Sequence, residues 1–301
     1  GGWRLALAWM GTVTLLHLFR PDGAHALFVW PGWILLLPGL LPLLCKKQPK
    51  AVVLLAWLAA LLVTSEEPYS LARHLLPAKK GSLRVVSLNC AGGTLEAAQE
   101  VVRLKPDILL LQESPSRPDL EKLKTQLFGS SGSLVWGPDA TLLARGSLVP
   151  HTLPRRTENF VSAEWTDEEG RTLNITSLRL QPPVLRLDLY DPSAWRSFAE
   201  NRRGRRAELQ EILAALEETP PDIFGGDFNT PPERSYVKGM ADSFAEEGRG
   251  YGATCVNPYP CIVRIDQIWR SDRLRTVNSF VVKTLHSDHR IAVSDFVWKE
   301  E

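Results

Sequence analysis

The sequence is poor in cysteine and has almost no net charge. Four cysteines in 301 residues are too few for a fold that is stabilised mainly by disulfides. The net charge of +1 hides an uneven distribution. Residues 1–80 contain 8 Lys/Arg and 3 Asp/Glu, so residues 81–301 contain 27 (35 minus 8) and 31 (34 minus 3), a balance of −4. This mildly acidic part argues against binding duplex DNA by charge alone, which requires a basic face, although a local basic groove remains compatible with it.

The cysteines fall into two groups. Cys45 lies in an apolar segment and Cys90 in a predicted strand, so both are expected to be small buried hydrophobes. Cys255 and Cys261 flank a proline-bent loop, residues 256–260, that would bring them within bonding range. We therefore predict a Cys255–Cys261 disulfide, conditional on an oxidising compartment.

Three apolar stretches occupy the first quarter of the chain: residues 3–19, 24–45 and 51–63. A membrane-spanning helix needs about 20 apolar residues, so the second stretch is long enough and the other two are short. The second is also interrupted by three prolines, which kink or end helices. A cleaved signal peptide would account only for the first stretch. We predict that residues 1–64 form a module of two or three transmembrane helices and that the protein is integral to the membrane.

The orientation of this module depends on its middle stretch. The connection at residues 46–50 is the most basic short loop of the region, and the positive-inside rule places it in the cytoplasm. If all three stretches span, the rest of the chain lies outside the cytoplasm, where the disulfide would also form. If the second stretch is re-entrant, the orientation reverses. We expect the first arrangement, with an extracytoplasmic globular domain.

The pattern changes after the module. Residues 65–81 are polar and charged and are predicted to be a linker, and residues 82–301 a globular domain with a long helix over 194–216. Alternating or continuous apolar runs predict its strands. These are residues 83–88, 108–111, 133–136, 141–144, 160–165, 172–180, 262–269, 276–282 and 291–298, with one more ending at Gly225. Strands and helices intermix without a repeat, which favours an α/β domain with two packed sheets over a barrel.

One hexapeptide, residues 225–230, stands out within this domain. Its sequence Gly-Gly-Asp-Phe-Asn-Thr follows a predicted buried strand and precedes two prolines. In extended chain, Asp227 and Asn229 would point to the same side and offer a carboxylate and an amide together. Such a pair suits a site where water is deprotonated beside a phosphate oxygen. The alternative is a simple turn, because Gly, Asp and Asn are all turn formers.

Polar residues also recur where other predicted strands end. They are Asn89, Glu113, Arg179, Asp266, and Asp288 with His289. Glu113 closes the run Leu-Leu-Leu-Gln-Glu, and a buried carboxylate needs a partner such as a hard divalent cation. An Asp–His pair would fix the imidazole tautomer and raise the histidine pKa, as contact with a phosphate requires.

Five short motifs together resemble the endonuclease/exonuclease/phosphatase superfamily over residues 82–299. They are Ser87-Leu88-Asn89, Leu111-Gln112-Glu113, Gly226-Asp227-Phe228-Asn229, Arg264-Ile265-Asp266 and Ser287-Asp288-His289. The chain is most similar to membrane-anchored bacterial members. The resemblance implies that residues 82–301 are the catalytic domain, with a four-layer α/β sandwich of two packed mixed β-sheets flanked by helices.

The resemblance also implies the chemistry and its residues. The activity would be phosphodiester or phosphomonoester hydrolysis with Mg²⁺, or Mn²⁺ in its place. Glu113 would bind the ion, with Asn89 and Asp288 close to it. Asp227 would orient or deprotonate the attacking water, and Asn229 would hold the phosphate. His289, paired with Asp266, would contact the scissile phosphate.

Arginines account for two further expectations. Many relatives carry His where this chain has Arg179, which cannot act as an acid but can clamp phosphate; the alternative is a surface charge on a strand. Arg202, Arg203, Arg205 and Arg206 would bind anionic lipid or nucleic acid, or else form an ordinary solvated helix face.

The favoured function is therefore a membrane-anchored, Mg²⁺-dependent phosphoester hydrolase. Its partners would be the bilayer and a phosphate-ester substrate, a membrane lipid or its headgroup. A membrane-tethered nuclease, for which the arginines argue, and a non-catalytic membrane scaffold are the alternatives. The oligomeric state is not indicated by the sequence.

Overall fold

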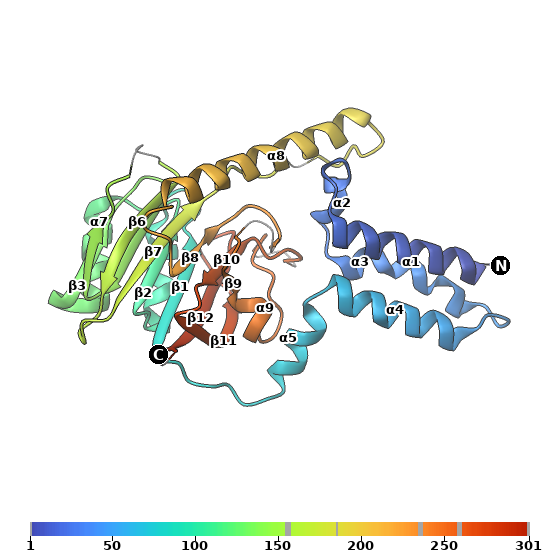
Figure 1. The fold of residues 1–301 in the computed structure, drawn as a ribbon, viewed down its shortest axis with the longest axis horizontal. Helices are drawn as coiled ribbons and strands as arrows, with labels where there is room; N and C mark the ends of the chain where they lie inside the picture. The colour runs from blue at the N-terminus through green and yellow to red at the C-terminus, as the bar shows by residue number, and fades with distance from the viewer. Residues whose placement is uncertain (1, 154–157, 185, 234–236, 258–260, 300–301) are drawn as a thin grey trace.

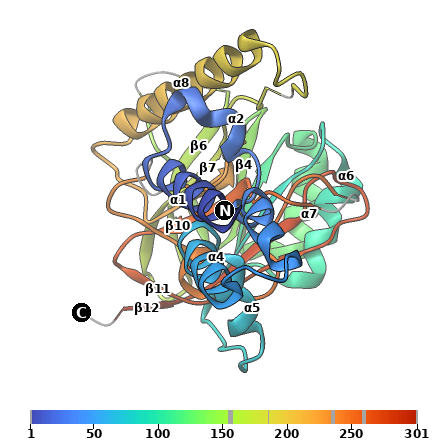
Figure 2. The same cartoon turned by 90° about the vertical axis from the view of Figure 1, so that its right-hand side faces the viewer.

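The structure, a computed structural model, describes residues 2–153, 158–184, 186–233, 237–257 and 261–299. In Figure 1 the N-terminal helices project from one side of a β-rich domain, and the N-terminus lies at their far end. Figure 2 looks along these helices toward the domain, where α1 (Gly2–Phe19) and α4 (Lys50–Thr64) lie in contact.

The N-terminal module is helical, but its middle is irregular. Between α1 and α4 the chain forms four short helices: η1 (Asp22–Ala24), α2 (His25–Phe28), α3 (Gly32–Leu36) and η2 (Leu37–Leu44). A proline disfavours helical backbone in the residue before it, so the helix is interrupted ahead of Pro31. Pro31 itself has non-helical backbone, with φ −57° and ψ 142°, at the start of α3. Met10, Val13, Leu36 and Ala60 form a small core between the helices. The second apolar stretch is therefore bent rather than one continuous helix.

The described helices differ in their capacity to span a membrane. None of these helices alone is long and apolar enough to cross a bilayer. Two bent pairs have the necessary length and composition: Asp22–Phe28 with Gly32–Leu44, bent by 92°, and Lys50–Thr64 with Glu67–His74, bent by 86°. The last of these segments is α5, which leads into the β-rich domain.

The domain contains two six-stranded sheets. The first has the order β11-β12-β1-β2-β4-β3 and the second the order β5-β6-β7-β8-β10-β9. The strands of the first are β1 (Leu83–Asn89), β2 (Ile108–Gln112), β3 (Gly132–Val135), β4 (Ala140–Arg145), β11 (Leu274–Val282) and β12 (Ile291–Trp298). Those of the second are β5 (Ser147–Pro150), β6 (Phe160–Thr166), β7 (Thr172–Arg179), β8 (Ile223–Asp227), β9 (Ala241–Asp242) and β10 (Asp266–Arg270).

Each sheet has one parallel pair of strands at its centre, and every other pairing is antiparallel. In the first sheet β1 runs parallel to β2, with Asn89 opposite Gln112. In the second, β7 runs parallel to β8, with Arg179 opposite Asp227. Both sheets are therefore mixed, as predicted, and each brings two carboxyl ends of strands together.

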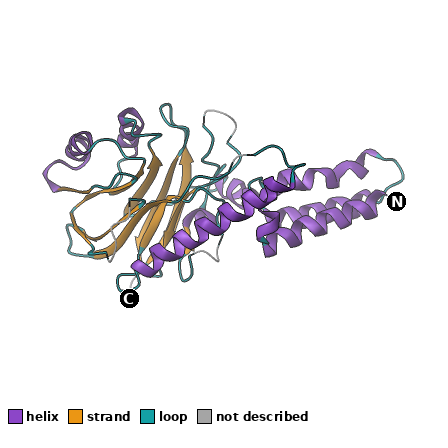
Figure 3. Cartoon of the chain, turned by 90° about the horizontal axis from the view of Figure 1, so that it is seen from above, coloured by secondary structure: helices purple, strands orange, loops and turns teal. Residues whose placement is uncertain are grey.

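Helices cover the outer faces of the two sheets, as Figure 3 shows. Side chains of both sheets, such as Ile108, Leu110, Ile175 and Ile223, form the core between them. On the first sheet pack α6 (Leu95–Gln99), η3 (Glu100–Leu104), α7 (Arg117–Phe128) and η4 (Gly129–Ser131), and on the second packs α8 (Pro192–Ala215). The short α9 (Ser243–Glu247) contacts β10 and β11. The predicted sandwich of helix, sheet, sheet and helix is confirmed.

Two of the four α8 arginines do not lie on a solvated helix face, so that expectation is wrong for them. Arg202 and Arg205 are buried. Arg202 forms an ion pair with Asp22 at 2.6 Å, and Arg205 is hydrogen-bonded to His25 at 3.1 Å. α8 reaches from the sheets to α2 in Figure 1, and these contacts fasten the N-terminal module to the domain.

A second group of ion pairs fastens α5 to the same domain. Arg264 is buried and binds Glu66 at 2.7 Å and 2.8 Å on one side. On the other side it binds Asp242 at 3.1 Å and 2.6 Å. Its guanidinium also lies 5.0 Å from the ring centre of Phe244. Two acidic partners and an aromatic ring compensate the burial of this charge.

The predicted Cys255–Cys261 disulfide is absent, because both cysteines carry free thiols. Cys255 instead forms isolated antiparallel bridges with Val263 and His289. The prolines at 258 and 260, from which the bend was predicted, lie outside the described residues.

Candidate active site

Polar side chains from both sheets meet at the carboxyl ends of the central parallel strands. The Asn89 amide, at the end of β1, donates to Glu113 at 3.1 Å and, across to the second sheet, to Asp227 at 3.0 Å. Asn89 is held in this orientation because its own oxygen accepts from the Ala91 N–H at 2.9 Å. The three residues are separated by as many as 138 positions in sequence, yet the sandwich brings them into direct contact.

The hexapeptide after β8 forms a turn and also brings the Asp227 carboxylate and the Asn229 amide together, so both interpretations of it hold. Gly226 has φ 140°, and a Cβ there would lie 2.0 Å from the Leu178 carbonyl oxygen, so this close approach requires glycine. Asn229 has φ 52°, and its N–H donates to Asp227 Oδ1 at 2.9 Å. The expectation of extended chain is therefore wrong, because the backbone turns at Asn229. The Asn229 amide donates to the Leu180 carbonyl at 2.8 Å, which fixes it beside Asp227.

Asp227, Asp266 and His289 form a buried group beside this turn. Asp266 lies opposite Asp227 in the antiparallel pair of β8 and β10. The His289 Nδ1 atom is 2.9 Å from Asp266, and its Nε2 atom is 4.0 Å from Asp227 Oδ2. The predicted Asp266–His289 pair is thus present, with the free side of the imidazole toward Asp227.

The electrostatics of this group follow from its burial and its charges. Burial and the neighbouring Asp266 carboxylate raise the pKa of Asp227 to about 6. Burial opposes a charge on His289, but Asp266 and two further carboxylates outweigh it and raise its pKa to about 10. At neutral pH the group therefore holds an imidazolium between carboxylates, with Asp227 able to exchange a proton.

Glu113 and Arg179 lie at the more open side of the site. Glu113 follows β2 with φ 46°, and its carboxylate accepts from the Gly92 N–H at 2.6 Å and pairs with Arg179 at 2.8 Å. Burial opposes ionisation of Glu113, but the Asn89 hydrogen bond and the Arg179 charge hold its pKa below the usual range. Arg179 is also 3.7 Å from Asp139. The structure thus places Arg179 beside Glu113, and its role in binding phosphate stays a prediction.

Asp288 differs from the other predicted site residues. Its side chain is exposed and makes no hydrogen bond or ion pair with any described residue. Its backbone carbonyl accepts from the Asn257 N–H at 2.7 Å, and its charge contributes to the raised pKa of the adjacent His289. The carboxylate lies near the site but is not built into its network.

Three residues without a predicted role hold the site together. The Ser287 hydroxyl donates to the Asn89 carbonyl at 2.7 Å and accepts from the His289 N–H at 3.0 Å. The Thr254 hydroxyl accepts from the N–H groups of Ile265 and Asp266, where β10 begins. The Asn257 amide donates to the Ser287 carbonyl at 3.1 Å. Of the three, only Ser287 could have been found from the sequence, because a hydroxyl two residues before a histidine is a common local bonding pattern.

Two parts of the site have donors suited to a cation. One ligand atom from each of Asp227, Asp266 and His289 lies within 4.8 Å of the others. Nδ1 of His289 is already bonded to Asp266, however, and its raised pKa favours a proton over a metal. Glu113 is a partly exposed oxygen donor whose lowered pKa keeps it ionised. Its chemistry fits a hard divalent cation, which prefers carboxylate and water oxygens.

Comparisons with known proteins agree with this architecture. The profile of the Endonuclease/Exonuclease/phosphatase family matches residues 86–289. Among solved structures, the chain is similar to a family protein from Bacteroides thetaiotaomicron, with 16% identity, a TM-score of 0.57 and coverage of 74% of this chain and 100% of that one. A mannosyl-6-phosphatase from Bacteroides thetaiotaomicron VPI-5482 has 17% identity, a TM-score of 0.53 and coverage of 72% and 100%.

A third similar structure is a functionally unknown conserved protein from Enterococcus faecalis V583, with 12% identity, a TM-score of 0.54 and coverage of 72% of this chain and 100% of that one. At these identities the likeness concerns the fold. No curated protein matches the sequence.

Proposed function

Because the chain belongs to the endonuclease/exonuclease/phosphatase family, we propose that it is a metal-dependent phosphoester hydrolase. One observation carries the proposal. Asp227, with its raised pKa, lies 3.0 Å from the Asn89 amide and 4.0 Å from an imidazole that Asp266 holds in position. A proton acceptor beside a buried imidazolium is what attack of water on a phosphate ester requires.

Asp227 is the proposed general base. As a carboxylate it accepts a proton from the attacking water, and a pKa near 6 makes it both ionised and basic at neutral pH. The Asn89 amide and the Asn229 N–H occupy its two oxygens and hold it in one orientation. This fixed orientation positions the water for in-line attack.

The phosphate group is proposed to bind against cationic and amide groups. His289 donates from Nε2 to a phosphoryl oxygen, and Asp266 keeps the imidazole protonated while charge develops on the phosphate. The Asn229 amide uses one N–H on Leu180 and offers the other to the phosphate. Arg179 is proposed to share its guanidinium between Glu113 and a substrate oxygen.

Mg²⁺, or Mn²⁺ in its place, is the proposed cofactor. Glu113 would hold it, with Asn89 and the exposed Asp288 nearby. When bound, such an ion lowers the pKa of water and neutralises charge on phosphoryl oxygens. Arg179 and the Gly92 N–H would keep the Glu113 carboxylate oriented.

The N-terminal module is proposed to lie in a membrane. Of the 24 large hydrophobic side chains exposed in the described part of the chain, 14 belong to residues 2–64. An aqueous surface of that kind is unfavourable, whereas lipid would cover it. The two bent helix pairs of this region also have the length and composition that a membrane segment needs.

The basic loop at residues 46–50 and the N-terminus lie at the end of the module away from the domain (Figure 1). With this loop in the cytoplasm, the catalytic domain is proposed to be extracytoplasmic.

A lipid or headgroup phosphate is the proposed substrate class. Arg20, directly after α1, donates to the Pro232 carbonyl at 2.9 Å, and Pro232 follows Asn229 by three residues. The active site is thus tied to the end of the module, which favours substrates at the bilayer surface. The nuclease alternative loses its main support, because Arg202 and Arg205 are buried against the module. The chain has all the polar residues of the five motifs, which argues against a non-catalytic scaffold.

The test is hydrolysis by the full chain in detergent with Mg²⁺. The panel contains phosphatidylglycerol, sphingomyelin, a phosphoinositide, a sugar 6-phosphate and DNA, and Asp227→Asn serves as the inactive control. The sugar phosphate is included because a mannosyl-6-phosphatase shares the fold. Turnover of a lipid that Asp227→Asn abolishes would support the proposal, whereas turnover of DNA alone would overturn the lipid assignment.

A further inference from the structure

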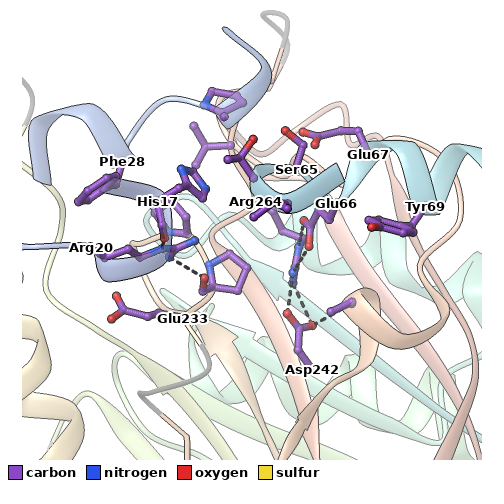
Figure 4. A pocket seen from close by; sticks show the side chains of 18 of the residues that line it. His17, Arg20, Phe28, Ser65, Glu66, Glu67, Tyr69, Glu233, Asp242 and Arg264 are labelled. Atoms are coloured by element: carbon purple, nitrogen blue, oxygen red, sulfur yellow. Dashed lines mark hydrogen bonds and ion pairs between the residues drawn. The ribbon is translucent and has the colours of Figure 1, made fainter. Parts of the chain in front are cut away.

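A cavity of about 840 Å³ lies between the N-terminal module and the catalytic domain. The ends of α1 and α4 and the start of α5 form its walls, and residues 231–233 and 262–264 form its base (Figure 4). None of the described residues that line it belongs to the active site. The two basal segments flank that site, however, because residue 231 follows Asn229 by two positions and residue 264 precedes Asp266 by two. A molecule in the cavity would contact both segments.

The mouth of the cavity is apolar and open. Leu18 and Phe19 at the end of α1 line it, as do Leu62 and Val63 at the end of α4. All four side chains are exposed, Phe19 by 77%. If the module lies in the bilayer, these residues lie where acyl chains meet headgroups. The mouth therefore suits the apolar part of an amphipathic molecule.

The interior contains polar groups that lack partners. His17 Nδ1 and Ser65 Oγ are buried and have no hydrogen-bond partner among the described residues, although such atoms are normally satisfied. Arg73 contacts the Ala245 carbonyl at 3.3 Å and forms no ion pair with a carboxylate in the part of the chain that the structure describes. Arg264, by contrast, is neutralised by Glu66 and Asp242. Arg73 and Glu67 thus both line the cavity without an ion pair among the described residues, and burial raises the pKa of Glu67, which favours its neutral form beside a phosphate.

We propose that this cavity holds the phosphodiester headgroup of a bilayer phospholipid that is not hydrolysed. Arg73 and Ser65 donate hydrogen bonds to the phosphate oxygens, and the acyl chains leave past Phe19 and Val63. The bound lipid packs on the segments next to Asn229 and Asp266 and thereby stabilises the active site. This inference rests on the membrane placement in the proposed function and adds a lipid site separate from the catalytic one.

The experiment uses the full chain, purified in detergent and stripped of lipid. Native mass spectrometry measures binding of phosphatidylglycerol, of diacylglycerol with the same chains, and of glycerophosphoglycerol, which has the phosphodiester headgroup but no chains. Hydrolysis of a water-soluble phosphoester is followed in parallel. We expect only phosphatidylglycerol to bind strongly and to increase turnover. Arg73→Gln should weaken its binding at least about tenfold, because it removes a charged hydrogen-bond donor to the phosphate.

A second variant and two controls make the test specific. Ser65→Phe should fill the cavity and remove lipid binding. Arg117→Gln and Ser130→Phe change exposed residues of α7 and η4, on the far side of the first sheet, and should bind lipid normally.

Equal binding of diacylglycerol or of the chain-free headgroup would overturn the proposal, as would normal lipid binding by Arg73→Gln. If the unaltered chain hydrolyses the phosphoester but does not bind phosphatidylglycerol, the cavity site alone is refuted. If the unaltered chain binds the lipid but hydrolyses nothing, only the proposed function is refuted.

Discussion

Arg202 binds both carboxylate oxygens of Glu233, at 2.9 Å and 2.8 Å, inside the protein rather than at its surface. The two side chains are 2% and 15% exposed. Glu233 follows Asn229 by four residues, and Arg202 also pairs with Asp22 of the N-terminal module. One guanidinium therefore joins the long helix, the module and the segment after the proposed active-site turn.

Replacing Arg202 by glutamine should destabilise the protein strongly, whereas the same change at the neighbouring Arg203 should have little effect. Loss of one partner from a buried ion pair costs about 3–5 kcal/mol, because the remaining carboxylates stay buried without their cation. Arg203 is exposed and donates to a backbone carbonyl of its own helix. Chemical denaturation of both variants in detergent measures the difference. Equal stability of the two variants would contradict the burial of Arg202.

Asp227→Asn should abolish most of the hydrolysis and leave the fold intact. The amide has the same shape but cannot accept a proton from water, and loss of a general base costs about 10²–10⁴-fold in rate. The turnover number should fall while the circular dichroism spectrum stays unchanged. As a control, Asp119→Asn changes a partly exposed carboxylate of α7, far from the site, and should retain full activity. Normal turnover by Asp227→Asn would exclude it as the base.

Activity should fall as the pH drops through about 6. Asp227 acts only when deprotonated, and burial and Asp266 raise its pKa to about 6, so acid removes the active form. The imidazolium of His289, with its pKa raised to about 10, gives a second limb at alkaline pH, where its proton is lost. Asp266→Asn removes the main carboxylate that raises the His289 pKa. In the pH–rate profile of that variant, the alkaline limb should therefore move to lower pH, and an unshifted limb would contradict the pairing.

Chelation of divalent ions should stop hydrolysis, and Glu113→Gln should raise the concentration of Mg²⁺ needed for half-maximal rate. Loss of a group that merely orients a ligand costs about 10–100-fold in metal affinity, so loss of a ligand should cost at least about tenfold. Titration of chelated protein with Mg²⁺, followed by rate and by calorimetry, measures this change. Glu121→Gln on the outer helix α7 is the matched control. An unchanged Mg²⁺ requirement in Glu113→Gln would place the ion elsewhere.

The sheet architecture was predictable because its signals are local. Alternation and short apolar runs mark the strands, and the polar residues that end them, such as Asn89, Arg179 and Asp227, mark one edge of each sheet. Asp266 and His289 could be paired from the motifs they belong to. The exposed position of Asp288 and the left-handed turn at Asn229 could not be predicted. Both depend on how the loops pack against Ser287 and Asp227.

Non-local contacts account for the wrong predictions. Arg202 and Arg205 have the local pattern of a solvated face, and only the approach of Asp22 and His25, about 180 residues away, buries them. The Cys255–Cys261 disulfide was inferred from spacing alone, but both cysteines keep free thiols and Cys255 pairs with Val263 and His289.

The ion pairs at the junction would be broken in a fragment that lacks the N-terminal module. A fragment starting at residue 82 would lose Asp22 from Arg202 and Glu66 from Arg264, while Glu233 and Asp242 stayed behind. Each arginine would keep one carboxylate partner and lose the other, so two guanidinium groups that are buried in the whole chain would become accessible next to the segments that bear Asn229 and Asp266. The binding properties and stability of such a fragment would therefore reflect the altered junction as well as the site itself.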